Sequence, residues 1–347
     1  MMNDIDRINS LKAINIAAFS IHEPSDPLIT FEPSWYNVWE SHMLRCSYKK
    51  TGSSSWSFKR YGFNNEMYRE GIRKASYRPF INAMENTFSH AYNSLNIKNR
   101  RSLKNERNGL IYIDSWGDLS SFEKIDNWKD TYSINIIPKK IIKDYSIKHF
   151  TSKLRGERNG FLNAFLMAQG LLNSDMLDNV FIYAGYRAVP VMMFTEIDKQ
   201  PKTHFLTKKI RNKTISIERT SCFILNKKME SEYSCEIDKY FSLSHNIKRS
   251  IDILIDNFNS TVGDNISSLY TSALPTHTHS YILNKFVTKS GMSSNHISLN
   301  ETYGDSGFLT PAMMWADLKK SNNKNNKDVM INLDGENGAW FVHSWRS

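Results

Sequence analysis

The sequence predicts an α/β fold in which helices pack in layers on β-sheets. Apolar, β-branched runs of strand length alternate along the chain with longer segments whose apolar side chains recur at helical spacing. This alternation favours sheets covered by helices. The pattern occurs twice, with an interruption near residues 228–243, and therefore predicts two α/β halves. A hydrophobic content of 40% in 347 residues is enough to build a sizeable core.

The first half, assigned to residues 1–240, begins and ends with a predicted strand. Strands are expected at residues 11–21, 110–113, 179–185 and 214–225. Helical spacing covers residues 65–95, where Pro79 is expected to break the helix in two. A stronger helix is predicted at residues 160–172, because its apolar side chains share one face. Loops are expected at residues 52–55 and in the basic stretch 207–213.

The second half, assigned to residues 241–347, repeats this alternation. Helices are predicted at residues 244–258, 280–290 and 308–318. Strands are predicted at residues 265–273, 296–299, 329–333 and 339–343, and the last two are expected to form a closing pair.

Composition limits the classes of protein that the chain can belong to. No apolar run approaches the roughly 18 residues of a membrane span, so none is expected. The three cysteines form no CxxC pair, which favours a reducing, cytoplasmic location over a disulfide scaffold or a zinc site. The N-terminus has two acidic residues and no long apolar stretch, so it does not resemble a secretory signal.

The net charge of +10 indicates either a soluble basic surface or attraction to an acidic partner. The basic residues form two clusters, which are Arg100, Arg101, Lys104 and Arg107, and Lys208, Lys209, Arg211 and Lys213. Neither cluster is interleaved with aromatic residues as in RNA-binding modules. Nucleic acid and an acidic carrier protein are both candidates for such a partner, and the missing aromatic residues argue against nucleic acid.

Two glycine-containing segments near the C-terminus carry the most specific pattern in the chain. Residues 300–305 read N-E-T-Y-G-D, and residues 335–341 read G-E-N-G-A-W-F. In spacing they resemble two signatures of the β-ketoacyl synthase family of the thiolase superfamily. Residues 159–168 also resemble the start of that family's nucleophile helix, and residues 178–185 and 217–225 resemble two of its strands. The resemblance implies a thiolase-like layered αβαβα fold made of two similar halves.

The positions at which a ketosynthase reacts are occupied here by other residues. Counting back from Gly160 places the nucleophile position at Glu157, whose carboxylate cannot form a thioester. The first His position falls on Leu274. The Lys and the second His are replaced by Asn300 and Asp305. The resemblance therefore implies a degenerate site without catalytic residues.

His277 and His279 are an alternative to this interpretation. A shift of three residues would bring His277 into the first His position. In an extended segment both rings would point to one face, where they could bind a metal, but no third ligand is apparent. The third interpretation is a pair of polar histidines at a strand end, and neither a metal nor a cofactor is expected.

A fold kept without its reactive residues resembles the chain-length factors of type II polyketide systems, in particular those of aryl-polyene clusters. The resemblance implies a subunit that is not an enzyme by itself, pairs with an active ketosynthase as a heterodimer, shapes the acyl tunnel and meets an acyl carrier protein. Two alternatives remain open. One is a catalytic acyltransferase of the ketoacyl-synthase-III type that uses His277 and Asp305 without a covalent cysteine. The other is a basic scaffold that docks the carrier protein alone.

Overall fold

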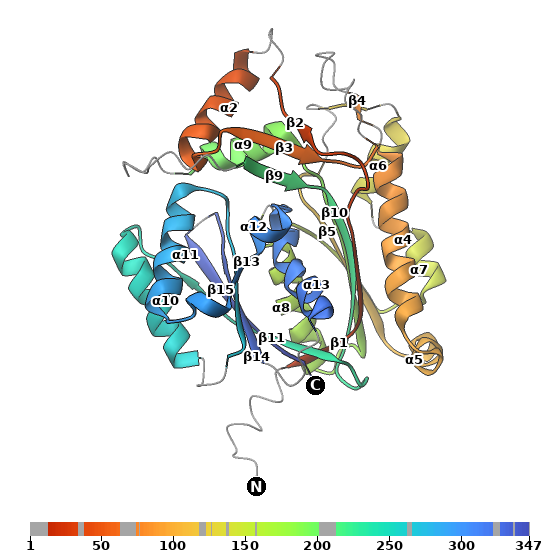
Figure 1. Ribbon diagram of the computed structural model, residues 1–347. Coiled ribbons are helices and arrows are strands. Elements are labelled where there is room, and N and C mark those ends of the chain that lie inside the picture. Colours follow the sequence, from red (N-terminus) through yellow and green to blue (C-terminus); the bar gives the residue numbers. More distant parts are fainter. Residues whose placement is uncertain are drawn as a thin grey trace.

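The structure is a computed structural model of the chain. It describes residues 13–33, 38–62, 74–75, 77–117, 123–125, 127–136, 139–156, 158–200, 213–261, 266–321, 327–335 and 337–346. Among these residues the strands form a ten-stranded mixed sheet, a three-stranded sheet and a two-stranded sheet (Figure 1).

The ten-stranded sheet consists of two half-sheets with the same strand order. The first has the order β7-β5-β8-β10-β1, with the strands β1 (Ile14–His22), β5 (Asn108–Asp114), β7 (Phe150–Arg155), β8 (Asn179–Tyr186) and β10 (Arg219–Asn226). The second has the order β13-β12-β14-β15-β11, with the strands β11 (Tyr233–Ser242), β12 (Ser268–Ser272), β13 (His296–Ser298), β14 (Lys327–Leu333) and β15 (Gly338–Arg346).

The strand directions repeat as well as the order. Within each half the first three strands of the order are parallel, and the fourth runs antiparallel to both of its neighbours. The half-sheets meet where Ile14–Ile16 of β1 pairs with β11. This repeat confirms the prediction of an α/β fold made of two similar halves, while the boundary at residue 240 stays a prediction.

Helices cover both half-sheets and fill the space between them (Figure 1). On the outer face of the first half lies α4 (Arg78–Ser94), with α5 (Ile97–Ser102) and α7 (Lys139–Asp144) near it. On the outer face of the second lie α10 (Ile247–Thr261) and α11 (His277–Lys289). Between the half-sheets lie α8 (Gly160–Asn173) and α13 (Met313–Lys320), so the layers are αβαβα.

The central helix α8 holds the layers together through aromatic side chains. Its Phe165 ring stacks on Trp315 of α13 at 5.2 Å between ring centroids, and it meets Phe223 of β10 edge-on at 5.5 Å. All three rings are fully buried. Because aromatic side chains bury large apolar areas, this cluster fixes the start of α8 relative to both halves.

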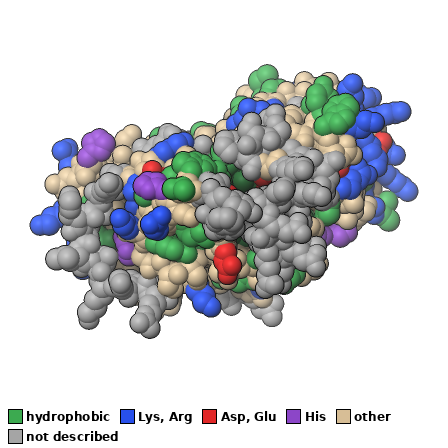
Figure 2. Space-filling view, turned by 90° about the horizontal axis from the view of Figure 1, so that it is seen from above, with side chains coloured by type: hydrophobic (Ala, Val, Ile, Leu, Met, Phe, Trp, Pro, Cys, Tyr) green, Lys and Arg blue, Asp and Glu red, His purple; other side chains and the backbone are tan. Residues whose placement is uncertain are grey.

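A cap covers the upper end of the sheet (Figure 1). It contains α2 (Val38–Thr51), α9 (Pro190–Asp198), β2 (Ile29–Thr30), β3 (Ser55–Lys59) and β9 (Lys213–Ile217). Beside it lie β4 (Lys74–Ala75), β6 (Lys124–Ile125) and α6 (Trp128–Asn135). The face seen from above shows more Lys and Arg than Asp and Glu side chains, in keeping with the net charge of +10 (Figure 2).

The single strand predicted at residues 214–225 is wrong, because the chain changes sheets in its middle. Buried Glu218 separates β9, which belongs to the cap, from β10. Its carboxylate accepts a hydrogen bond from Arg60 Nε at 2.8 Å and lies 3.1 Å from Arg187 Nε. A buried ion pair at the start of a strand does not change the spacing of the apolar residues, so the sequence pattern does not reveal the break.

Other boundaries also differ from the expectation. Pro79 occupies the first turn of α4, where a missing N–H is tolerated, instead of breaking a helix, and residues 65–73 lie outside the described part. The interruption predicted at residues 228–243 contains β11. The helix predicted at residues 308–318 begins as the 3-10 helix η3 (Gly307–Ala312), which contains Pro311.

Candidate functional site

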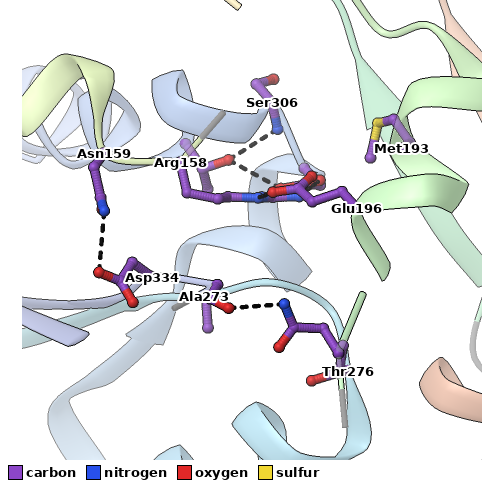
Figure 3. Close-up of polar contacts among 12 residues, drawn as sticks. Arg158, Asn159, Met193, Glu196, Ala273, Thr276, Ser306 and Asp334 are labelled. Atoms are coloured by element: carbon purple, nitrogen blue, oxygen red, sulfur yellow. Dashed lines mark hydrogen bonds and ion pairs between the residues drawn. The ribbon is translucent and has the colours of Figure 1, made fainter. Parts of the chain in front are cut away.

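The candidate site is centred on Arg158, the second residue before α8. Its guanidinium binds two carboxylates, Glu196 from α9 and Asp305 from the loop between α12 (Leu299–Tyr303) and η3 (Figure 3). Arg158 Nε donates to Glu196 Oε1 at 2.7 Å, and Nη1 donates to Asp305 Oδ1 at 2.5 Å. Nη2 donates to Glu196 Oε2 at 3.0 Å and to Asp305 Oδ2 at 2.9 Å. The guanidinium is therefore held by a bidentate contact on each side.

The three charged groups are almost completely withdrawn from water. Their side chains are 2–6% exposed. Burial acts to lower the pKa of Arg158, but the nearby carboxylates, first Asp305 and then Glu196, outweigh it and hold the pKa above its ordinary value. Arg158 is thus positively charged at every physiological pH. Burying such a group is tolerable only when most of its donors are paired, and the two carboxylates accept four of its five N–H groups.

Asp305 is fixed from several sides. Its Oδ1 also accepts hydrogen bonds from Asn300 Nδ2 at 3.1 Å and from Thr310 Oγ1 at 3.3 Å. Its backbone pairs with β9, since the Asp305 N–H donates to Ile215 O at 2.8 Å. The preceding Gly304 has a φ of +74°, a conformation that favours glycine, and it turns the chain toward β9. Strand β9 of the cap and the segments on either side of Asp305 thus hold the Asp305 carboxylate in place together.

A second polar group lies beside this cluster at the starts of α8 and α11. Asn159 Nδ2 donates to Asp334 Oδ2 at 3.0 Å (Figure 3), and Trp340 Nε1 donates to Asn159 Oδ1 at 3.1 Å. Thr276, the residue before α11, accepts a hydrogen bond from the His279 N–H. Burial, reinforced by Arg158 and opposed by Asp334, lowers the pKa of His279 to about 4, so its ring is neutral at pH 7.

Residues of the Arg158 cluster line two cavities. The first, of about 640 Å³, is lined by Asp305 and Asn300 at one end and by residues of β9, β12 and α11 elsewhere. The second, of about 740 Å³, is lined by Arg158, Asn159 and Glu196 and by residues before α8 and after α9. Both volumes lie in the range of small-molecule sites. The ion pair from Arg158 to Asp305 joins the wall of one cavity to the wall of the other.

The structure brings together some of the residues named from the sequence. Asn300 and Asp305 are in contact, as given above, and Leu274 is fully buried in the wall of the first cavity. Glu157 lies outside the described residues. His277 is the first residue of α11 and packs against Gly52, and it is not among the described residues that line either cavity.

The extended segment expected around His277 and His279 is wrong. Both belong to the first turn of α11, because Thr276 caps the helix there. His279 is buried against Thr276, with 2.9 Å between its Nδ1 and the threonine Oγ1. Among the described parts of the chain no group of three or more His, Cys, Asp or Glu side chains could hold a metal ion.

Arg158, Glu196 and Asp334 are the site residues that the sequence did not reveal. Arg158 directly follows Glu157, and an arginine just before a helix of small and apolar residues was a usable signal. Glu196 lies on α9, for which no helix was predicted, and nothing local marks it. Of the cysteines, Cys222 and Cys235 are buried in strands, and burial raises the pKa of each thiol. None of the three lines the described walls of the cavities.

Comparison with solved structures establishes the fold class. OleA from Xanthomonas campestris matches with a TM-score of 0.57 and 10% sequence identity, over 96% of this chain and 98% of that one. A cerulenin-bound OleA from the same organism matches with a TM-score of 0.56 and 9% identity over the same shares of the two chains. The 3-oxoacyl-[acyl-carrier-protein] synthase III from Aquifex aeolicus matches with a TM-score of 0.54 and 11% identity, over 96% of this chain and 100% of that one.

These matches confirm the predicted thiolase-like fold for nearly the whole chain. At such low identity they show the fold and no more. Neither a family model nor a curated protein sequence matches the chain. No helix in the described ranges has the length and apolar character to cross a membrane.

The prediction that the chain is not an enzyme by itself is contradicted by the same comparison. The structures that match it from end to end include a 3-oxoacyl-[acyl-carrier-protein] synthase and a cerulenin-bound OleA, so the fold itself gives no support to a subunit without catalysis. That prediction relied on the positions assigned to Glu157, Leu274, Asn300 and Asp305, and these assignments stay predictions.

Proposed function

We propose that the chain is an acyltransferase that takes an acyl group from a thioester carrier and passes it directly to an acceptor. The observation that carries this proposal is that residues of one buried ion-pair cluster line both cavities, Asp305 the first, and Arg158 and Glu196 the second. Two substrates, one in each cavity, would react at this cluster. Holding both in one place accounts for a large part of the rate gain that enzymes provide.

The roles of the side chains follow from their positions. Arg158 is the group that would stabilise negative charge on the oxygen of the thioester carbonyl, through the one Nη1 N–H that the two carboxylates do not accept. Glu196 and Asp305 are positioning residues that orient its guanidinium. His277, which the sequence suggested as a catalytic group, has no role in this proposal, since it lies at neither cavity. Direct transfer is favoured over a covalent thioester because no cysteine lines the described cavity walls.

Release of free thiol from acyl-coenzyme A tests the proposal. The purified chain is mixed with acyl-coenzyme A of several chain lengths, thiol release is followed with a colorimetric reagent, and the protein is examined by intact mass. We expect release without an acyl adduct. Arg158→Met should lower the rate by about 100-fold or more, the usual effect of losing one oxyanion donor.

Arg107→Gln is the matched control, because this arginine pairs with Asp178 at the surface, away from both cavities. Release that is unaffected by Arg158→Met, or a stoichiometric adduct on any residue, would contradict direct transfer at this site.

A partner chain of the same fold is the second part of the proposal. No further strand pairs with the outer edge of β7 among the described residues. The nearby helix α8 exposes Leu166 and Met167, which are 44% and 36% exposed. An open strand edge beside exposed apolar side chains favours pairing with another chain. An active ketosynthase is the partner we propose for this edge, and an acyl carrier protein is the proposed source of the acyl group.

A further inference from the structure

The second cavity differs from a binding site for a fatty acyl chain in the nature of its walls. Trp116 and Met192 are the only apolar side chains among the described residues that line it. The other lining residues are two glycines and nine polar or charged residues. An acyl chain gains affinity by removing apolar surface from water, and it would gain little here. The walls instead suit a ligand that forms hydrogen bonds.

The polar groups inside this cavity are held in fixed orientations. The Asn159 amide is fixed by Asp334 and Trp340, as described above, and it keeps one N–H for a further bond. Gln200 Nε2 donates to Gly335 O at 2.8 Å. Ser115 is buried in the same wall. Groups held in this way lose little entropy when a polar ligand binds to them.

The charged groups at the open side of this cavity are positive. Arg155 and Lys199 line it, and both are exposed. The Arg155 guanidinium is 3.7 Å from Asp114 Oδ2, a carboxylate that Lys153 already approaches to 2.9 Å. The single negative charge of Asp114 is therefore shared by Lys153 and Arg155, and positive charge remains at the open side of the cavity, here called the rim. An anionic group is the complement of such a rim, and arginine is well suited to carboxylate or phosphate.

We propose that the second cavity binds the acceptor, and that the acceptor is a small polar molecule with a carboxylate or phosphate group. The anionic group lies between Arg155 and Lys199, and a hydroxyl or amine at the other end reaches the Arg158 cluster. That group attacks the thioester carbonyl carbon. A carbon–oxygen or carbon–nitrogen bond forms, the carbon–sulfur bond breaks, and the thiol leaves with the proton that the acceptor loses. This inference rests on the proposed function and names its second substrate class.

Direct binding tests it without any thioester. Calorimetric titrations use succinate, glycerol 3-phosphate and octanoate as probes of the intact chain. We expect saturable binding of succinate or glycerol 3-phosphate, and the better of the two identifies the anionic group. Joint replacement Arg155→Gln and Lys199→Gln should weaken that binding by about tenfold or more. Asn163→Asp, an exposed change in the same wall, should weaken it as well.

Lys213→Gln is the matched control, because it removes one exposed positive charge at the first cavity and should leave anion binding unchanged. Tighter binding of octanoate than of both anions would overturn the proposal, as would anion binding that the rim variants do not affect. If no anion binds while thiol release persists, this inference fails alone. If anions bind but no thioester is ever cleaved, the proposed acyl transfer fails and the polar site remains.

Discussion

The Arg158 side chain is only 6% exposed, so its charge is balanced chiefly by Glu196 and Asp305. Breaking a buried ion pair by removing one partner leaves uncompensated charge in the interior. We therefore expect Arg158→Ala to lower the free energy of unfolding by roughly 3–5 kcal/mol. Urea denaturation followed by circular dichroism measures it. Because stability and activity would fall together, the kinetic test described above must use variants shown to be folded.

Replacing the arginine and both carboxylates together separates the effect on stability from the effect on activity. Combining Arg158→Met with Asp305→Asn and Glu196→Gln removes the ion pairs and keeps similar volumes, so stability should recover while thiol release stays low. An Arg158→Ala variant as stable as the unmodified chain would mean that the two carboxylates find other partners. Exposed Arg107 gives the comparison, since its replacement should leave the unfolding free energy nearly unchanged.

His279 makes the stability of the chain depend on pH. Its pKa is lowered from 6.5 to about 4 in the folded chain, chiefly by burial. Between pH 4 and pH 6.5 the unfolded chain therefore binds a proton at this histidine, and the folded chain does not. The stabilisation of the folded chain that depends on a neutral His279 ring is complete above pH 6.5 and is lost as the pH falls toward 4. The loss is about 3 kcal/mol, by the relation between pKa shift and free energy.

Comparison with His279→Gln isolates this effect. Urea midpoints measured from pH 7 down to pH 4 should fall less steeply for the variant, because glutamine does not titrate in this range. Equal slopes for the two proteins would assign the acid sensitivity to other groups. The charged neighbours that shift the pKa of His279 are Arg158 and Asp334, so both must remain unchanged in the comparison.

At the scale of elements, β7 and α8 form the edge at which a partner chain is proposed. We expect Leu166→Asp with Met167→Asp to abolish pairing, because two charges would be placed where apolar surface is to be buried. Light scattering after size-exclusion chromatography measures it, for the chain alone and mixed with a ketosynthase. Leu28→Asp is the matched control, since Leu28 is 47% exposed and lies between β1 and β2. A chain that stays monomeric in every mixture would refute the pairing.

The elements that could be predicted are those whose burial leaves a regular trace in the sequence. β8 is buried along its whole length and α8 along one face, and both were predicted to within a residue or two. β11 was missed because Glu236, Asp238 and Lys239 interrupt its apolar residues, and α9 because no prediction covered its region. The change of sheet at Glu218 depends on Arg60, 158 positions away along the chain. No local pattern carries that information.

The candidate site was predictable only in part for the same reason. Asn300 and Asp305 lie on either side of Gly304, a spacing that is visible in the sequence, and they are in contact. Arg158 is 147 positions from Asp305, and their pairing appears only when the two half-sheets bring α8 and η3 together. The position counted from Gly160 named Glu157, one residue away from the arginine that the fold places at the centre.

At the scale of the whole molecule, the site belongs to neither half alone. Arg158 and Glu196 come from the first half, and Asp305, Asp334 and His279 come from the second. The matching strand order places the start of one helix from each half, α8 and α11, at the same polar cluster. Any change in how the halves pack would therefore separate the charges of the Arg158 cluster.

The net charge of +10 predicts how the carrier protein finds the chain. Carrier proteins are generally acidic, and opposite charge accelerates encounter more than it raises affinity. Lys213 is exposed at the first cavity, and the basic stretch containing Lys208, Lys209 and Arg211, which lies outside the described residues, directly precedes it in sequence. Joint reversal of these three to Glu should slow thiol release from acyl carrier protein. Release from an uncharged acyl-N-acetylcysteamine thioester should not fall with it.

Reversal of Arg100, Arg101 and Lys104 around the end of α5 is the matched comparison, with the same change in net charge at a distance from the cavities. Stopped-flow rates at low salt should fall only for the first set. The difference should shrink near physiological ionic strength, where screening acts over about 8 Å. If both sets slow the reaction equally, the carrier responds to net charge alone. If neither does, the positive charge serves solubility, and the carrier docks on the partner chain instead.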